Sequence, residues 1–178
     1  MVSSTDPTDP TDARLVRRAQ RGSRDAAASL FARHWPRAWR AALAVTGRHA
    51  LADDVAQDAF ERAFGRLQTF DASRPFAPWL HRIVVNRALD ALRQERRLVP
   101  VGDPPERAAA RDDDADDREA LAAVAALSPE RRAVVVLRHL LDYSPPEIAE
   151  MLDLPVGTVN SRLGRALAEL RERLGERA

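Results

Sequence analysis

The side chains best suited to chemistry in this sequence are the carboxylates of ALADDVAQDAFERAFGRL, residues Ala50–Leu67. Paired carboxylates can ligate a metal ion or act as general acid and base. His49 is the nearby candidate partner, but no Glu-x-x-His or His-x-x-x-His spacing appears, and successive acids on one helix do not converge. The pattern therefore favours a solvated or partner-binding helix face over a metal-dependent enzyme. We expect a protein that is not an enzyme, with no catalytic residue, metal or cofactor.

A second set of candidates joins aromatic rings to arginines. Gln68–Pro78 (QTFDASRPFAP) is predicted to be a loop by its Pro, Ser and Asp content, and Trp79 follows it directly. Trp79–Arg97 is predicted to be a helix with a polar, mainly cationic outward face. Because bases stack on aromatic rings and arginine neutralises phosphate, these two segments could hold unstacked bases of a nucleic acid. The alternative is that Phe76 and Trp79 belong to the core.

A third set lies in Ser144–Leu174, which has the pattern of a helix, a tight turn and a longer helix. Ser144 and Glu147 predict a capping box for the first helix, and Pro155 ends it, because proline disfavours helix in the residue before it. The second helix should start near Val156 or Gly157 and bury an apolar stripe. Its outward face carries Thr158, Asn160, Ser161, Gly164 and Arg165, with Arg162 at the edge. Such a face suits the major groove of DNA; the alternative is a hairpin with a solvated face.

The spacing of apolar residues predicts the helices that position these candidates. The predicted helices begin at about Ala13 and include Ala26–Trp39, Ala50–Leu67, Trp79–Arg97, Ala120–Leu127, Ser128–Leu141 and the two helices of Ser144–Leu174. Pro36 is expected to kink or break its helix. Within Ser128–Leu141 the residues expected to be buried are Val134, Val135, Leu137, Leu140 and Leu141.

Two segments lack this pattern and divide the chain. Residues 1–12 are polar and of low complexity, which predicts a disordered N-terminal tail. Residues 98–119 contain three prolines and a dense run of acids, which predicts a flexible acidic linker. We therefore expect an all-α fold with two helical domains, residues 13–97 and 120–178, the C-terminal one carrying the helix-turn-helix.

The composition agrees with a helical protein that meets a charged partner. Of the 178 residues, 45% are hydrophobic but only 5% aromatic, so the cores must be built mostly from Ala, Leu and Val. Cysteine is absent, which excludes disulfides and thiolate metal sites. No apolar run approaches the roughly 20 residues of a membrane span, so we expect a cytoplasmic protein without membrane insertion. Between Arg14 and Arg97, 17 arginines stand against 8 acids, which suits a polyanion or an acidic protein surface.

Three stretches in this order resemble the extracytoplasmic-function (group IV) sigma factors of bacterial RNA polymerase. DDVAQDAFERAF is similar to the family's polymerase-clamp-binding helix, and FAPWLHRIVVNRALDALRQERR to the helix that reads and opens the −10 element. The stretch from LSPERRAVVVL to LRERL is similar to the fourth sigma domain, which reads the −35 element. The resemblance covers about residues 26–97 and 121–174. It implies a sigma factor that binds core RNA polymerase and directs promoter-specific transcription initiation.

The resemblance also implies a role for each surface. The coiled coil of the β′ clamp would meet Asp53, Asp54, Gln57, Asp58 and Glu61. Single-stranded −10 DNA would meet Phe76, Trp79, Arg82, Asn86, Arg87, Asp90 and Arg93, with a flipped base captured beside the Gln68–Pro78 loop. Double-stranded −35 DNA would meet Thr158, Asn160, Ser161, Arg162 and Arg165, while the rest of that domain would meet the polymerase β flap.

Two positions depart from the family's usual pattern. Asn160 stands where lysine or arginine is common, and Gly164 where a larger side chain is common. Asparagine can read adenine through two hydrogen bonds, while Gly164 weakens its helix by up to about 1 kcal/mol relative to alanine. The acidic linker would replace the third sigma domain and thread a basic channel of the polymerase.

Members of this family are commonly held inactive by an anti-sigma factor, so the resemblance implies such a partner for this chain. The competing hypothesis is a stand-alone helix-turn-helix regulator whose N-terminal half senses a ligand or dimerises. Such a regulator binds its operator tightly without polymerase, usually as a dimer on a palindrome. A sigma factor, in contrast, is expected to bind DNA specifically only as holoenzyme.

Overall fold

Helices form every regular element of the described structure. The computed structural model describes residues 10–98 and 122–175, and no strand occurs within these two ranges. The first range holds α1 (Pro10–Gln20), α2 (Arg24–Thr46), α3 (His49–Gly65), the 3₁₀ helix η1 (Leu67–Thr69) and α4 (Phe76–Leu98). The second holds a helical stretch at residues 122–126, α6 (Pro129–Val135), the π-helix η2 (Val136–Leu140), α7 (Pro145–Leu152) and α8 (Val156–Gly175). The predicted all-α fold with two helical domains is confirmed, whereas the predicted linker lies outside the described residues beyond position 98.

α1 begins earlier than its apolar spacing predicts. It starts at Pro10, and proline suits the first turn of a helix because its missing N–H has no acceptor there. Residues 10–12 of the predicted tail are therefore helical. Asp12 is buried, with its carboxylate 3.0 Å from Arg33 Nη1 and 2.7 Å from His34 Nε2 of α2. This charged contact ties α1 to α2, and no periodicity of apolar residues reveals it.

α2 is one helix from Arg24 to Thr46, so the break considered at Pro36 does not occur. Both ends are capped in ways that the sequence encodes. Ser23 accepts a hydrogen bond from the backbone N–H of Ala26 at 3.3 Å. Gly47 ends the helix at φ 71°, a left-handed conformation that favours glycine, and donates to Leu43 O at 2.7 Å.

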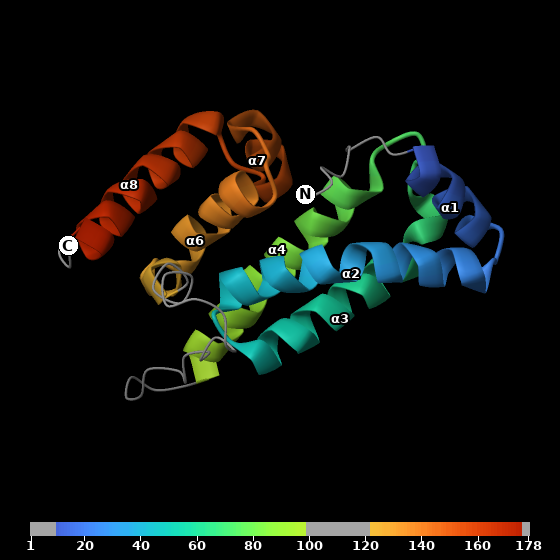
Figure 1. Ribbon diagram of the computed structural model, residues 1–178, viewed down its shortest axis with the longest axis horizontal. Coiled ribbons are helices and arrows are strands. Elements are labelled where there is room, and N and C mark those ends of the chain that lie inside the picture. Colours follow the sequence, from blue (N-terminus) through green and yellow to red (C-terminus); the bar gives the residue numbers. More distant parts are fainter. Residues whose placement is uncertain (1–9, 99–121, 176–178) are drawn as a thin grey trace.

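α2, α3 and α4 form the core of the first domain, with α1 packed against α2 (Figure 1). Small side chains let these three helices approach closely. The fully buried alanines are Ala38, Ala41, Ala42, Ala52, Ala56, Ala59, Ala63 and Ala88. Larger buried side chains, such as Leu30, Leu80 and Val84, fill the remaining space. The acidic helix α3 and the arginine-rich helix α4 are thus packed closely together in one core.

α4 begins at Phe76, three residues before its predicted start, so the predicted loop is shorter than expected. Pro78 lies in the first turn of α4, where proline costs no helical hydrogen bond. Phe76 is only 2% exposed, and its ring centroid lies 5.1 Å from that of His34, 5.9 Å from Phe70 and 5.7 Å from Trp79. Phe76 is therefore a core residue, as the alternative interpretation held.

The helix-turn-helix forms as its sequence predicts. The backbone N–H of Ser144 donates to Glu147 Oε2 at 2.7 Å, and a capping box is present at the start of α7. Asp153 ends α7 in the left-handed region, at φ 54°, and α8 begins at Val156. Three members of the predicted apolar stripe of α8 are buried, namely Val159, Leu163 and Ala166.

Two apolar residues of the second domain that the spacing predicts to be buried are exposed, namely Leu140 and, near the end of α8, Leu174. Leu140 is 38% exposed, whereas Val136 is buried. The cause at Leu140 is that Val136–Leu140 is a π-helix, closed by a hydrogen bond of 3.1 Å from Leu141 N to Val136 O. The wider π turn rotates the following side chains relative to an α-helix, so a prediction based on α-helical spacing fails there.

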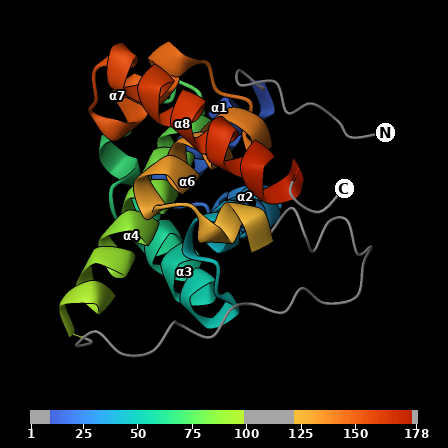
Figure 2. The same cartoon turned by 90° about the vertical axis from the view of Figure 1, so that its left-hand side faces the viewer.

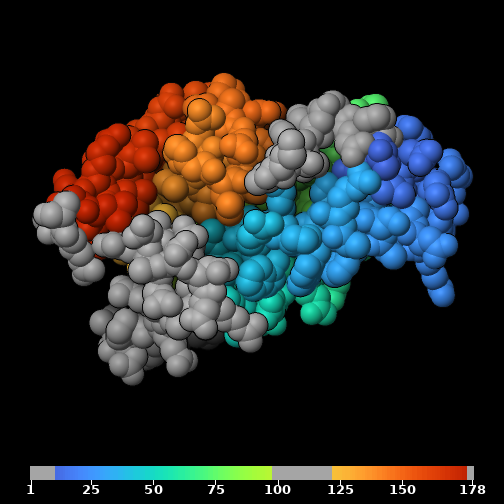
Figure 3. All heavy atoms as spheres, viewed as in Figure 1, coloured from blue at the N-terminus to red at the C-terminus, as the bar shows by residue number. Residues whose placement is uncertain are grey.

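The two domains pack against each other in this structure. α6 and η2 contact α2 (Figure 3), while α4 contacts both α6 and α7 (Figure 2). At one end of the interface, the buried guanidinium of Arg132 donates from Nη1 to Val45 O of α2 at 2.7 Å. The same group donates from Nη2 to Leu127 O at 3.0 Å and to Ala125 O. Burial, followed by the charge of Arg96, lowers the pKa of Arg132.

Candidate functional site

The acidic face of α3 consists of Asp53, Asp54, Gln57 and Glu61, all exposed to solvent. Asp53 accepts a hydrogen bond from Trp39 Nε1 at 2.6 Å, and Gln57 Nε2 donates to Glu61 Oε1 at 3.2 Å. The side chain of Asp54 has no hydrogen-bond or ion-pair partner in residues 10–98 and 122–175. The acidic face is thus held by a few short-range contacts and stays open to a partner.

Asp58 differs from this acidic face, although the sequence groups it there. Its carboxylate lies 2.9 Å from Arg62 Nε of the same helix and also binds Arg87 Nε of α4. Burial acts to raise the pKa of Asp58, but the hydrogen bonds and charges of Arg62 and Arg87 outweigh it, so the pKa is lowered. Asp58 therefore ties α3 to α4 and is less free to meet another molecule.

The metal-binding alternative finds no support in the geometry of α3. The ring of His49 packs against Trp39, with 5.7 Å between ring centroids. In the part of the chain that the structure describes, no three His, Asp or Glu side chains gather as metal ligands would.

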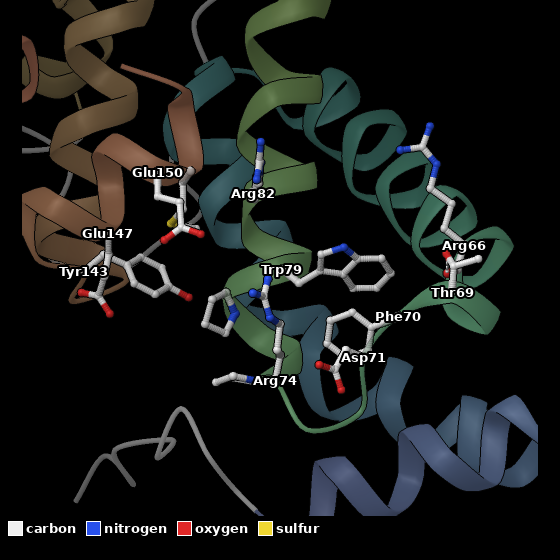
Figure 4. A pocket seen from close by; sticks show the side chains of 13 residues that line it. Arg66, Thr69, Phe70, Asp71, Arg74, Trp79, Arg82, Tyr143, Glu147 and Glu150 are labelled. Atoms are coloured by element: carbon white, nitrogen blue, oxygen red, sulfur yellow. Dashed lines mark hydrogen bonds between the residues drawn. The ribbon is translucent and has the colours of Figure 1, made fainter. Parts of the chain in front are cut away.

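A cleft of about 710 Å³ lies where the start of α4, the segment before it and α7 meet (Figure 4). Its lining residues are Arg66, Thr69, Phe70, Asp71, Arg74, Pro75, Pro78, Trp79, Arg82, Tyr143, Glu147, Glu150 and Met151. Trp79 is half-buried and lies against Phe70, with 4.5 Å between ring centroids. Figure 4 shows Phe70 and Trp79 on one side and Glu147 and Glu150 of α7 on the other.

The rim of this cleft has a defined backbone turn. Asp71 Oδ1 accepts hydrogen bonds from Ser73 N at 2.9 Å and Ser73 Oγ at 2.7 Å, and Arg74 N donates to Asp71 O at 2.9 Å. The hydrogen bond from the Ser73 hydroxyl, followed by that from its backbone, lowers the pKa of Asp71. Arg74, which belongs to this turn, lines the cleft together with Arg66 and Arg82, so three arginines share the lining with the aromatic rings.

The predicted −10 residues on α4 occupy different environments. Trp79 and Arg82 line the cleft. Asn86 donates from Nδ2 to Met151 O of α7 at 3.4 Å. Arg87 binds Asp58, and Arg93 Nη1 lies 3.1 Å from Asp90. Phe76 is buried, so the prediction that it contacts DNA is wrong. Its ring instead lies against that of Trp79 and supports it from within the core.

Sequence reasoning missed several lining residues of the cleft. Arg66, Asp71 and Arg74 lie next to or within a predicted loop, where their charges offered a signal. Glu147, Glu150 and Met151 come from α7, more than 60 residues further along the chain. No local pattern could place them beside Trp79, because only the packing of the two domains does so.

The outward face of α8 agrees with its predicted surface. Four of its residues are exposed, namely Asn160, Ser161, Gly164 and Arg165, while Thr158 and Arg162 are half-buried. A side chain at Gly164 would meet no other atom within 4 Å. Further along α8, Glu169 lies 2.7 Å from Arg131 of α6 and 3.0 Å from Arg173, which holds the helix in place. The hydrogen bond from Arg173 is the largest influence, and the pKa of Glu169 is lowered.

Comparison with known proteins gives matches over both domains. The family model described as Sigma-70 region 2 matches residues 30–98, and that described as Sigma-70, region 4 matches residues 117–170. RNA polymerase sigma factor CarQ of Myxococcus xanthus is 34% identical over 161 residues, covering 87% of this chain and 92% of CarQ. ECF RNA polymerase sigma factor SigM of Mycobacterium tuberculosis is 37% identical over 159 residues, covering 86% of this chain and 80% of SigM.

Two solved structures are also similar. CnrH, in complex with the cytosolic domain of CnrY, has a TM-score of 0.69 and 31% identity, covering 94% of this chain and 99% of CnrH. The sigma factor RpoE from Bartonella quintana, in complex with the anti-sigma factor NepR, has a TM-score of 0.70 over 83% of this chain and 95% of RpoE. At 22% identity, the RpoE comparison bears on the fold alone. None of the described helices is both long and apolar enough to cross a membrane.

Proposed function

Because this chain belongs to the extracytoplasmic-function RNA polymerase sigma factors of the sigma-70 family, we propose that it brings core polymerase to promoters through three separate surfaces. The sigma factor performs no catalysis itself. Its binding energy for single-stranded −10 DNA shifts the promoter from closed to open, and the polymerase carries out the chemistry. The residues of each surface follow from their exposure and charge. We assign this activity to the cytoplasm, where promoters and polymerase meet.

The acidic face of α3 is the proposed contact for the coiled coil of the β′ clamp. Asp54, Gln57 and Glu61 are exposed, and Asp54 has no partner among the described residues. Asp53 is also exposed but already accepts a hydrogen bond from Trp39. Asp58 contributes less, because Arg62 and Arg87 hold its carboxylate. A face of this charge repels DNA phosphates and suits a protein partner.

The cleft at the start of α4 is the proposed site for single-stranded −10 DNA. Trp79 offers a ring for stacking a base, and stacking contributes about 1–3 kcal/mol per base. Arg66, Arg74 and Arg82 supply positive charge around it for the phosphates. Arg87, Asp90 and Arg93 are paired with other side chains, so we assign them to shaping this surface as well as to meeting the DNA.

The exposed face of α8 is the proposed reader of the −35 element. Its N-terminal half carries Asn160 and Ser161 at the surface, followed by Arg165 one helical turn later. Asn160 can pair with adenine through its amide, whereas Arg165 can bind either a guanine edge or a phosphate. Thr158 and Arg162 flank these side chains and are partly buried. The remaining surface of the second domain is the proposed contact for the β flap.

We also assign an anti-sigma factor to this chain. CnrH, similar over nearly its whole length at 31% identity, was solved in complex with the cytosolic domain of CnrY. The partner proposed here would cover the DNA- and polymerase-binding surfaces of both domains. If only polymerase subunits co-purify with this chain from uninduced cells, an anti-sigma factor is excluded under those conditions.

The observation that carries the proposal is that the exposed acidic face of α3 and an aromatic surface edged by arginines at the start of α4 belong to the same helical domain. The experiment measures binding of a fluorescent promoter fragment by the chain alone, by core polymerase alone and by the two together. We expect specific binding only from the mixture. Tight, sequence-specific binding by the chain alone would instead indicate the stand-alone regulator.

A further inference from the structure

The interface between the two domains contains a buried histidine that pairs with a tyrosine of the other domain. His81 of α4 is 2% exposed and Tyr143, just before α7, is 7% exposed. His81 Nδ1 lies 2.8 Å from Tyr143 Oη, and the two residues are 62 positions apart in the sequence. Among the described residues, Asn86 and Arg132 also make polar contacts across the same interface, to Met151 O and Val45 O.

Only the neutral form of His81 fits this environment. Its second ring nitrogen, Nε2, is buried and has no hydrogen-bond partner in the described residues. In a neutral imidazole, Nδ1 and the tyrosine hydroxyl form one hydrogen bond. An imidazolium carries an N–H on both ring nitrogens, so its Nε2–H would be buried without an acceptor. An unpaired buried charge is costly, so protonation of His81 opposes closure of the domains.

Most of the charged groups near the pair favour a neutral His81 and a protonated Tyr143. The charges of His34 and Arg37 of α2 act on His81, and those of Glu147 of α7 and Arg37 act on Tyr143. Burial first, then the charges of His34 and Arg37, lower the pKa of His81 to about 3. Burial, together with Glu147, raises the pKa of Tyr143, although Arg37 opposes this, so the tyrosine keeps its proton.

The closed interface also covers the surface assigned to −10 DNA. Tyr143, Glu147 and Glu150 form the wall of the cleft opposite Phe70 and Trp79 (Figure 4). The two glutamates therefore face the space that a DNA strand would need, and their charge repels phosphate. The amide of Asn86 is bound to Met151 O and is not available to a base.

We propose that this chain closes on itself, with α7 covering the −10 surface of α4, and that protonation of His81 releases this autoinhibitory contact. The closed contact between the domains does not depend on the proposed promoter function. Only the effect of closure on DNA binding rests on that function. The closed state is favoured when His81 is neutral, so its stability is full above the ordinary histidine pKa of 6.5 and declines as pH falls below it. With a closed-state pKa of about 3, the closing constant falls about tenfold between about pH 7.5 and about pH 5.5.

The experiment follows the separation of the domains by energy transfer between two dyes. The natural sequence has no cysteine, so Arg40→Cys on α2 and His139→Cys on η2 provide two labelling sites. Both positions are exposed, and they lie on elements that pack together, so opening moves the dyes apart. We expect energy transfer to be high at about pH 7.5 and to fall at about pH 5.5.

Variants assign the effect to His81. His81→Gln keeps a polar group and His81→Phe keeps a ring, and neither titrates, so either should hold energy transfer constant over this pH range. His49→Gln is the matched control and should retain the full response. Energy transfer that does not change with pH in the parent protein, or that still changes in both His81 variants, would overturn the proposal.

A second readout separates this proposal from the promoter function. The labelled chain is titrated with single-stranded oligo(dT), because base stacking and phosphate contacts do not require a promoter sequence. We expect up to about tenfold tighter binding at about pH 5.5 in the parent than in His81→Gln, because the closed state no longer competes. If the domains separate at low pH but the affinity for DNA does not rise, the result supports the closed contact and counts against the assignment of the cleft to −10 DNA.

Discussion

Substitutions of two carboxylates of α3, Asp54 and Asp58, should have opposite effects. Changing Asp54 should weaken polymerase binding and leave stability nearly unchanged, whereas changing Asp58 should lower stability and leave binding nearly unchanged. Asp54 is exposed and has no partner in the described residues, so Asp54→Arg should alter the free energy of unfolding by less than about 0.5 kcal/mol. Asp58 binds both Arg62 and Arg87. Its carboxylate is 32% exposed, so after allowance for solvent screening we expect Asp58→Asn to cost about 1 kcal/mol.

For the affinity for core polymerase the order should be reversed, with the larger loss at Asp54. Replacing Asp54 by arginine puts a positive charge at the proposed clamp contact. Close charge pairs across interfaces couple by about 1.5 kcal/mol or more, which corresponds to at least about a tenfold loss of affinity for core polymerase. Asp58→Asn should weaken core binding by less than about threefold, because its charge is already neutralised by two arginines.

Urea denaturation followed by circular dichroism measures the first quantity, and fluorescence anisotropy with core polymerase measures the second. The pH dependence offers a further check on Asp58. Because its folded-state pKa is lowered, its stabilising contribution is present above about pH 3.8 and is lost as pH falls through the folded-state value. Normal core binding by a folded Asp54→Arg protein would refute the assignment of α3 to the clamp.

Three further substitutions test the other surfaces. Gly164→Ala should stabilise the protein by about 0.5–1 kcal/mol in urea denaturation, because alanine favours helix and meets no neighbouring atom; a loss of stability would contradict the open environment of this position. Arg165→Ala should weaken holoenzyme binding to the −35 duplex by about 1–3 kcal/mol in filter binding, and an unchanged affinity would remove it from the DNA contact. Trp79→Ala should reduce promoter opening, measured by permanganate reactivity of unpaired thymines, while leaving −35 binding intact; normal opening would exclude stacking on this ring.

Local signals in the sequence were sufficient for much of the fold. Ser144 and Glu147 predict the capping box, and the start of α8 at Val156 agrees with the prediction because Pro155 and the apolar stripe both act over a few residues. The same holds for α3, whose buried face follows from 3.6-residue spacing. These elements are determined by contacts between near neighbours in the sequence, which periodicity describes well.

The failures came where local rules compete with packing. Pro75 and Pro78 predicted a loop, but a proline in the first turn of α4 is compatible with helix, and burial of Phe76 extends the helix to that residue. Leu140 is exposed because a π-helix interrupts the α-helical spacing. Asp58 is indistinguishable from Asp54 by residue type, and only its contact with Arg87 of α4 sets it apart.

The lining of the cleft could likewise be predicted only in part from the sequence. Trp79 and Arg82 were predicted from their residue types, whereas its opposite wall comes from α7 and depends on how the domains pack. The contact between His81 and Tyr143 joins residues 62 positions apart, and nothing in either segment specifies the other. Residue types therefore indicate which surfaces can bind nucleic acid, and the tertiary structure decides which of them are free to do so.

The central claim is that this chain directs polymerase to promoters, and run-off transcription tests it most directly. Core RNA polymerase is mixed with genomic fragments, with and without the purified chain, and the transcripts are mapped to their start sites. We predict discrete transcripts that require the chain, with shared sequences centred near −10 and −35 upstream of each start. If no fragment yields a transcript that depends on the chain, although it binds core polymerase, the proposed function is contradicted.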